Sequence, residues 1–230
     1  MIKKLIVILL ALFLFGCSEQ SALIFQDEAE GSITKFDNDT HGTYVSTYVP
    51  LPGKDTVIRN ATVFDGNGNK FLNYDVFFSQ GKISEMGRDL PIVGAEEIDG
   101  NGLFVTPGII DIHSHMGVYP APGVRTSSDG NEATSPNTAE VWAEHSVWSQ
   151  DPQYKLALAG GITTFHVLPG SANLFGGRGV TLKNVSANTV PDMKFPGAPH
   201  SLKMACGENP KRVYSSRGPS TRMGNVAGYR

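Results

Sequence analysis

The sequence predicts an α/β fold in which a small β-sandwich-like domain precedes a parallel sheet. Three observations support this prediction. Short β-type runs separated by Gly and Asn turns fill residues 56–105. A Thr-Pro-Gly turn at 106–108 then introduces an apolar segment, residues 109–115, of the kind that forms buried parallel strands. A helix and a second strand follow over residues 151–168, which indicates a parallel pair joined by a right-handed crossover.

The first residues have the pattern of a bacterial export signal. Two lysines stand near the N-terminus, an apolar run covers residues 5–15, and a cysteine follows at position 17. The run is too short for a membrane-spanning helix, which needs about 20 apolar residues. Because residues 14–17 resemble a lipobox, we expect cleavage before Cys17 and a lipid anchor on its thiol. Ser18 favours the periplasmic side of the outer membrane; simple secretion is the alternative.

Composition and charge narrow the range of functions. The formal net charge is -3 and no stretch is rich in Lys and Arg, which argues against nucleic acid as a partner. Cys17 and Cys206 are the two cysteines of the chain. If Cys17 is acylated, no disulfide can form, and Cys206 is better explained as a small apolar residue than as a nucleophile.

Each predicted element has a local cause. The turns at 65–69 and 79–82 carry the Gly and Asn residues that give hairpins their left-handed backbone. The Asp-Pro pair at 151–152 offers an N-cap followed by proline in the first helical turn, and the Gly-Gly pair at 160–161 ends that helix. The glycine-rich stretch 176–179 lacks the spacing of a phosphate loop, so we expect a conformational loop there.

Two histidines close the apolar segment 109–115. Side chains alternate between the two faces of a strand, so His113 and His115 project the same way, with Asp111 below them. Neutral imidazole nitrogens are good ligands for zinc and similar divalent ions. A catalytic metal needs further ligands and an open position for water, so the pair is half of a site. Two purely structural histidines are the alternative.

The sequence around these histidines carries a family resemblance. Residues 104–115, Phe-Val-Thr-Pro-Gly-Ile-Ile-Asp-Ile-His-Ser-His, resemble the first barrel strand of the amidohydrolase superfamily. Residues 160–173 resemble the second strand, in the manner of the imidazolonepropionase and prolidase-like branch. The resemblance extends over residues 56–230. It implies a (β/α)8 TIM-type barrel flanked by a small β-domain.

The same resemblance implies a chemistry. His113 and His115 would bind one or two divalent metal ions, commonly zinc, with Asp111 supporting an imidazole N–H from behind. Metal-activated water would hydrolyse a C–N bond in a small-molecule amide, a cyclic amide or a dipeptide, outside ordinary proteolysis.

A third metal ligand is expected on a later strand. Lys203 lies among apolar residues within 201–208, where a buried ammonium is costly unless it is paired or neutralised. Some superfamily members carry a carboxylated lysine in such a strand, and others use a glutamate near the strand end. Lys203 and Glu208 are therefore alternative ligands, of which we favour Lys203. A lysine that only reaches the barrel rim is the third alternative.

Two further residues are candidates for contact with the substrate. His166 lies on the second predicted strand and reaches the same barrel end, although a hydrogen-bonded core histidine is the simpler interpretation. Arg178, in the glycine-rich stretch, is placed to bind a substrate carboxylate. His145 is better explained by packing.

The barrel is expected to be incomplete. A full eightfold barrel needs about 250 residues, and far fewer follow Pro107. We therefore expect a truncated chain that is inactive by itself. The resemblance implies a general-base aspartate, which would lie beyond Arg230. The predicted segments are a signal peptide at 1–16, a tether at 17–54, a small β-domain at 55–106 and a partial metal-dependent hydrolase barrel at 107–230.

Two rival functions remain at this stage. A metal-dependent phosphoesterase also uses two histidines on a barrel strand, but the flanking β-domain and the lack of a basic phosphate clamp argue against it. A non-catalytic surface lipoprotein that keeps the half-barrel as a binding or remnant module is the second rival. The oligomeric state is left open.

Overall fold

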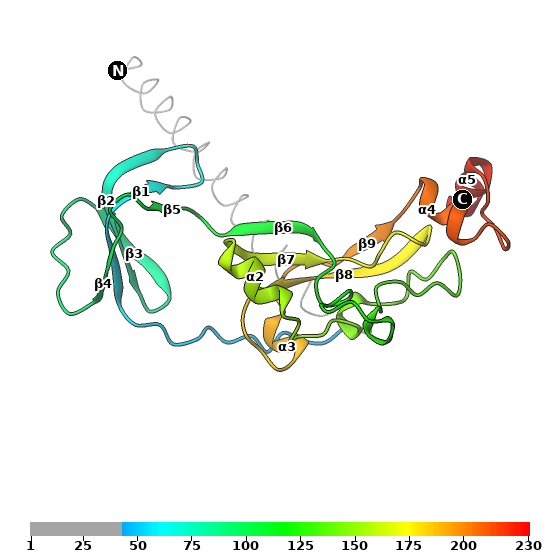
Figure 1. Ribbon diagram of the computed structural model, residues 1–230, viewed down its shortest axis with the longest axis horizontal. Coiled ribbons are helices and arrows are strands. Elements are labelled where there is room, and N and C mark those ends of the chain that lie inside the picture. The colour runs from blue at the N-terminus through cyan, green and yellow to red at the C-terminus, as the bar shows by residue number, and fades with distance from the viewer. Residues whose placement is uncertain (1–42) are drawn as a thin grey trace, which may run out of the picture.

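The structure, a computed structural model, describes residues 43–230, and Figure 1 shows them as two units joined by extended chain. The predicted signal peptide and the predicted lipid anchor at Cys17 lie outside the described residues. Among the helices of the described part, none is both long and apolar enough to cross a membrane.

The first unit is the predicted small β-domain, here a five-stranded sheet. Its strands are β1 (Thr56–Phe64), β2 (Lys70–Ser79), β3 (Lys82–Gly87), β4 (Glu96–Asp99) and β5 (Phe104–Val105), in the order β3-β2-β1-β4, with β5 also on β1. The first three strands are antiparallel, and β4 and β5 run parallel to β1. Gln80 and Gly81 both have positive φ between β2 and β3, which confirms the predicted hairpin turn.

The second unit contains a four-stranded sheet in the order β6-β7-β8-β9. Its strands are β6 (Ile109–Ser114), β7 (Ile162–Val167), β8 (Phe175–Lys183) and β9 (Ser201–Met204). Helix α2 (Gln153–Ala159) joins β6 to β7, and these two strands are parallel, so the predicted strand, helix and strand unit is confirmed. The α/β class is confirmed with it.

Strand β8 corrects one prediction from the sequence. The expected loop at 176–179 is part of this strand, which is antiparallel to both β7 and β9. Glycine is needed here because other groups occupy the space of a side chain: a Cβ on Gly179 would lie 2.7 Å from His166 Nε2 and from Ser201 Oγ. Because β8 is antiparallel to both of its neighbours, β9 runs in the same direction as β7 and β6.

The two faces of this sheet differ in character. One face packs on a core made by the loops, α2 and α3 (Val190–Met193). The buried members of this core are Val118, Ala143, Val147, Tyr154, Phe165, Val167, Val180, Leu182 and Met193. The opposite face carries polar side chains, because residues that alternate with the core positions, such as His166 and Thr181, point away from it. The chemistry of the unit therefore lies on that polar face.

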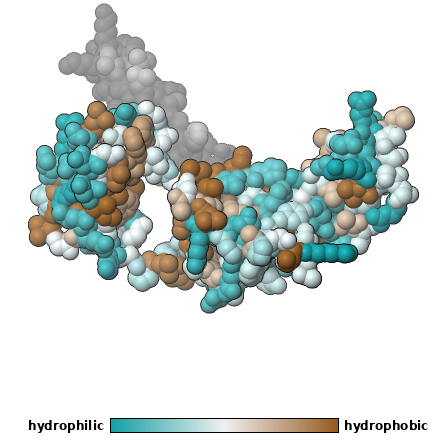
Figure 2. Space-filling model, in the orientation of Figure 1, coloured by the Kyte–Doolittle hydropathy of each residue, from teal (hydrophilic) through white to brown (hydrophobic). Residues whose placement is uncertain are grey.

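Strand β6 is less buried than its sequence predicts. It forms the edge of the sheet, and Ile110 and Ile112 are 62% and 78% exposed. No element in residues 43–230 covers their side. Figure 2 shows apolar surface where this sheet faces the β-domain.

The remaining elements are short. They are the 3-10 turns η1 (Arg125–Ser127) and η2 (Ala143–His145), and the helices α4 (Glu208–Val213) and α5 (Arg222–Tyr229). His145 lies in η2, a single 3-10 turn.

The end of the predicted tether lies against the second unit. The backbone amide of Thr47 donates to the Pro191 carbonyl, 3.0 Å away, and the amide of Tyr44 donates to Glu144 Oε1 at 2.9 Å. Lys194 Nζ donates to the Tyr44 carbonyl at 2.6 Å and pairs with Glu144 at 2.5 Å. Residues 43–49, which we call the strap, are therefore fixed to this unit by a buried ion pair.

Candidate metal centre

The end of β6 brings the two predicted histidines together. The ring centroids of His113 and His115 are 5.2 Å apart, with the rings edge to face. His115 Nδ1 lies 2.9 Å from the carbonyl oxygen of Leu168, just after β7. A carbonyl oxygen only accepts hydrogen bonds, so Nδ1 carries the proton and Nε2 keeps its lone pair. His115 therefore presents a free ligand nitrogen.

Lys203 meets this pair from β9. Its Nζ lies 3.2 Å from His113 Nε2, although the two residues are on strands separated by β7 and β8. The Lys203 charge, together with burial and the neighbouring His115, lowers the pKa of His113, against an opposing effect of Asp111. Burial lowers the pKa of Lys203 itself. The lowered pKa of His113 favours its neutral form, which is the form that binds a metal.

These donors fit part of a divalent metal site. No group of three or more His, Cys, Asp or Glu side chains comes together within residues 43–230. Two imidazoles and a half-buried lysine amine do come together near the end of β6. A carboxylated lysine would add oxygen ligands there.

The structure separates the two alternative third ligands. Glu208 begins α4, where its carboxylate pairs with Lys211 at 3.0 Å and is 72% exposed. Of Lys203 and Glu208, it is Lys203 that contacts His113. The favoured candidate from the sequence is thus the one that the fold brings to the histidines.

Asp111 takes a different position from the one expected. Its Oδ1 accepts a hydrogen bond from the backbone amide of His113 at 3.0 Å, so it fixes the strand end and not an imidazole N–H. The partner that orients an imidazole is the backbone carbonyl of Leu168. Sequence reasoning missed it because a backbone oxygen leaves no mark in the residue type.

The comparisons with known proteins agree with this geometry. No protein-family model matches the sequence. The amidohydrolase tasK of Hapsidospora irregularis is 33% identical over an alignment of 216 residues, which covers 80% of this chain and 22% of that protein. The crystal structure of an amidohydrolase from Thermotoga maritima MSB8 is 42% identical with a TM-score of 0.69, and the match covers 76% of this chain and 45% of that chain. This chain belongs to the amidohydrolase superfamily.

A shorter match points the same way. A dihydroorotase from Pelotomaculum thermopropionicum is 40% identical over 60 residues, which are 26% of this chain and 14% of that protein. The chain spans less than half the length of each of these amidohydrolase relatives.

His166 has both of its ring nitrogens engaged in this amidohydrolase chain. Nδ1 lies 2.9 Å from Thr181 Oγ1, and Nε2 lies 2.6 Å from Ser201 Oγ. Burial lowers the pKa of His166, with smaller effects of the neighbouring histidines. Ser201 stands two residues before Lys203 on β9, so His166 helps to hold the strand that carries Lys203. This arrangement favours the structural interpretation of His166 over contact with a substrate.

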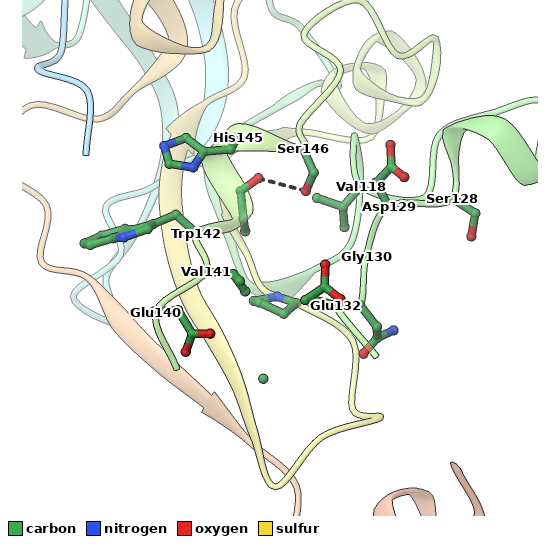
Figure 3. A pocket seen from close by; sticks show the side chains of 14 residues that line it. Val118, Ser128, Asp129, Gly130, Glu132, Glu140, Val141, Trp142, His145 and Ser146 are labelled. Atoms are coloured by element: carbon green, nitrogen blue, oxygen red, sulfur yellow. Dashed lines mark hydrogen bonds between the residues drawn. The ribbon is translucent and has the colours of Figure 1, made fainter. Parts of the chain in front are cut away.

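Arg178 lies on the ring of Trp142 and does not face the histidines. Its guanidinium carbon is 4.7 Å from the centre of that ring. Trp142 belongs to the wall of a cavity of about 570 Å³, and Figure 3 shows the carboxylates of Asp129, Glu132 and Glu140 around it. Three carboxylates disfavour a negatively charged ligand, so the cavity does not support the predicted carboxylate-binding role of Arg178.

A second cavity, of about 280 Å³, does reach one of the candidate metal ligands, because its wall includes His115. The other residues that line it are Tyr119, Asn131, Gly170, Ser171, Ala172, Asn209, Arg212 and Val213. No local sequence pattern reveals this cavity, because its wall combines separate loops with α4.

Proposed function

We propose that the protein containing this chain is a metal-dependent hydrolase of C–N bonds in small amides, cyclic amides or dipeptides. The observation that carries the proposal is the convergence of His113, His115 and Lys203 near the end of β6 in an amidohydrolase-superfamily chain. A divalent ion, with zinc as the first choice, supplies a nucleophilic water near neutral pH and polarises the amide carbonyl when bound. The relatives named amidohydrolase and dihydroorotase support the same bond type.

The residues of this chain have distinct roles in the proposal. His113 and His115 hold the metal through Nε2, and Leu168 keeps the His115 tautomer that makes this nitrogen available. Lys203 contributes the third ligand as a carboxylated side chain. Asp111 and His166 are positioning residues, since they fix the ends of β6 and β9.

Hydrolysis by the full-length protein tests the proposal. Dihydroorotate, dihydrouracil, hydantoin and alanyl-proline are incubated with protein that is loaded with zinc, and with protein treated with a chelator. We expect turnover of at least one of these compounds, lost on chelation and restored by zinc, and absent in His113→Asn. Hydrolysis of a phosphodiester with no C–N hydrolysis would instead support the phosphoesterase, and no hydrolysis of either kind would support the non-catalytic lipoprotein.

We further propose that the protein is exported and lipid-anchored through Cys17. The support is the sequence of residues 1–18, and the strap then gives the chain a fixed entry into the second unit. Metabolic labelling with a radioactive fatty acid is expected to mark the wild-type protein and to leave Cys17→Ala unlabelled. Equal labelling of both would contradict the anchor.

A further inference from the structure

The wall of the cavity beside His115 is polar, and hydrogen bonds between its residues fix its shape. Tyr119 lies against the His115 ring, with centroids 5.7 Å apart, and Asn131 Nδ2 donates to the Tyr119 hydroxyl. Asn131 Oδ1 accepts from the backbone amide of Ala172 at 3.1 Å. A Cβ on Gly170 would lie 2.2 Å from Asn131 Nδ2, so glycine is required for this close packing. The wall is therefore held in place on the side of the metal ligand.

The opposite part of the wall presents a cation. Arg212 Nη2 donates to Asn209 Oδ1 at 3.1 Å, and Asn209 Nδ2 in turn donates to Ser171 Oγ. A guanidinium has five N–H donors, and this contact uses one of them. In the described part of the chain, no carboxylate forms an ion pair with Arg212, whereas Glu208 on the same helix is paired with Lys211.

The charge of the lining distinguishes this cavity from the larger one. None of its lining side chains is acidic, and Arg212 is joined by hydroxyl and amide groups that can donate hydrogen bonds. The larger cavity is lined by three carboxylates. Of these two cavities, the one beside His115 is the one whose lining favours an anion. The volume of about 280 Å³ is near the lower end of the range of about 300–1,000 Å³ for small-molecule sites, which restricts the anion to a small one.

We propose that this cavity binds the carboxylate of the substrate, with Arg212 as its counter-ion. The inference rests on the proposed function and narrows its substrate class to small amides that carry a carboxylate near the scissile C–N bond. The carboxylate is held by the planar guanidinium fork, which suits this group geometrically. Asn209 positions the fork. The amide then extends toward His115, which lines the same cavity.

Binding of a matched pair of probes to the full-length protein tests this inference without relying on turnover. N-acetyl-L-proline and N-acetyl-L-prolinamide have nearly the same shape, and calorimetry gives their dissociation constants. We expect the wild-type protein to prefer the carboxylate, and Arg212→Met to weaken its binding by at least about 30-fold, the lower end of what loss of one partner of a charge pair costs. Binding of the prolinamide should change little.

Two further variants sharpen the test. Arg212→Lys keeps the charge and loses the fork, so we expect an intermediate affinity. Arg222→Met removes an exposed arginine from α5, outside the cavity, and should leave both affinities unchanged. Equal affinity for the two probes, no binding of either, or an unchanged affinity in Arg212→Met would overturn the inference.

The same variants separate this inference from the proposed function. If the wild-type protein hydrolyses dihydrouracil as efficiently as dihydroorotate, and Arg212→Met leaves both rates unchanged, the hydrolase stands and the carboxylate site is overturned. If no C–N bond is hydrolysed but Arg212 governs binding of N-acetyl-L-proline, the site stands and the hydrolase fails.

Discussion

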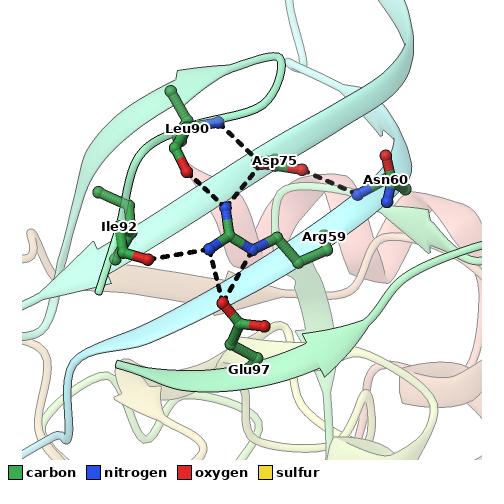
Figure 4. A network of polar contacts seen from close by, with 6 residues as sticks. All are labelled: Arg59, Asn60, Asp75, Leu90, Ile92 and Glu97. Carbon is green, nitrogen blue, oxygen red and sulfur yellow. Dashed lines mark hydrogen bonds and ion pairs between the residues drawn. The ribbon is translucent and has the colours of Figure 1, made fainter. Parts of the chain in front are cut away.

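Two clusters of charged and titratable groups, one in each unit, differ in how many of their charged groups have a partner of opposite charge. In the β-domain, Arg59 donates to Asp75 at 2.9 Å and to Glu97 at 2.6 Å, and also to the carbonyls of Leu90 and Ile92 (Figure 4). Asp75 accepts further hydrogen bonds from backbone amides. Every charge in this cluster has its partner within the domain.

The cluster at the end of β6 is not satisfied in this way. Lys203 Nζ has His113 Nε2 as its partner, so one nitrogen base faces another with no carboxylate at the contact. In a purely structural cluster the buried charges are paired, as those of Arg59 and Asp75 are, because an unpaired buried charge is costly. The contact between Lys203 and His113 is exposed, so water can solvate both groups without a carboxylate. In the function proposed above, a metal ion would complete this cluster.

The largest effect is expected from Lys203→Met in the full-length protein. Loss of a direct ligand should reduce metal affinity by more than the roughly 10–100-fold that loss of a supporting contact costs, and activity should fall with it. Chemical unfolding of the metal-free protein should be nearly unchanged, because a half-buried lysine without a carboxylate adds little stability. Lys155→Met, on the exposed side of α2, is the control. An active, metal-replete Lys203→Met would show that this cluster is only structural.

The next largest effect is expected at the ion pair that fixes the strap. The Glu144 side chain is fully buried and Lys194 is 9% exposed, so Lys194→Met leaves an uncompensated buried carboxylate. This should lower the free energy of unfolding by about 3–5 kcal/mol, measured by urea denaturation, and should expose the strap to proteolysis. Replacing both residues, with Glu144→Gln, should recover part of the loss. A loss of unfolding free energy below about 1 kcal/mol is typical of a surface pair. Such a result would contradict the view that Glu144 and Lys194 form a buried pair that the fold depends on.

A smaller, pH-dependent effect is expected from Asp75→Asn. Burial by itself would raise the pKa of Asp75, but hydrogen bonds from the Asn60 amide, the Arg59 guanidinium and the Leu90 amide outweigh it and hold the pKa below its usual range. A depressed pKa in the folded state stabilises the protein above the pKa of an unfolded aspartate, about 3.9, and this stabilisation is lost as the pH falls through the folded-state value. We expect Asp75→Asn to lose about 1–3 kcal/mol at pH 7.

The pH dependence supplies the check on that prediction. Unfolding free energies of wild type and Asp75→Asn, measured from pH 7 downward, should approach each other below about pH 4. A constant difference across this window would mean that the Asp75 charge does not stabilise the domain.

The smallest effect is expected from Glu208→Gln. Its carboxylate forms an exposed pair with Lys211, which contributes about 0–1 kcal/mol. Metal content, activity and stability should all stay close to wild type. Loss of metal in Glu208→Gln but not in Lys203→Met would reverse the assignment of the third ligand.

The sequence predicted the parts of the fold that depend on local patterns. The hairpin at Gln80 and Gly81 and the parallel pair β6 and β7 follow from turn residues and alternation, and the structure confirms them. The sequence could not predict β8, because Gly176, Gly177 and Gly179 have low strand propensity. Their role is to leave space for neighbours such as His166, which becomes visible only once β7 and β9 are in place.

The candidate site was predictable to the same extent. The spacing of His113 and His115 is a local signal, and the apolar surroundings of Lys203 marked it as unusual. The cavity beside His115 depends on Arg212, which no local pattern distinguishes from other exposed arginines. Contacts that combine distant loops, or that use a backbone oxygen such as that of Leu168, require the structure.

Metal analysis of the purified full-length protein tests the central claim most directly. Wild type and a variant with both His113→Asn and His115→Asn are prepared side by side, and metal content is measured by mass spectrometry together with hydrolytic activity. We predict at least one equivalent of a divalent metal in wild type, and loss of both metal and activity in the double variant. A double variant that keeps the wild-type metal content would contradict the assignment of these histidines as ligands.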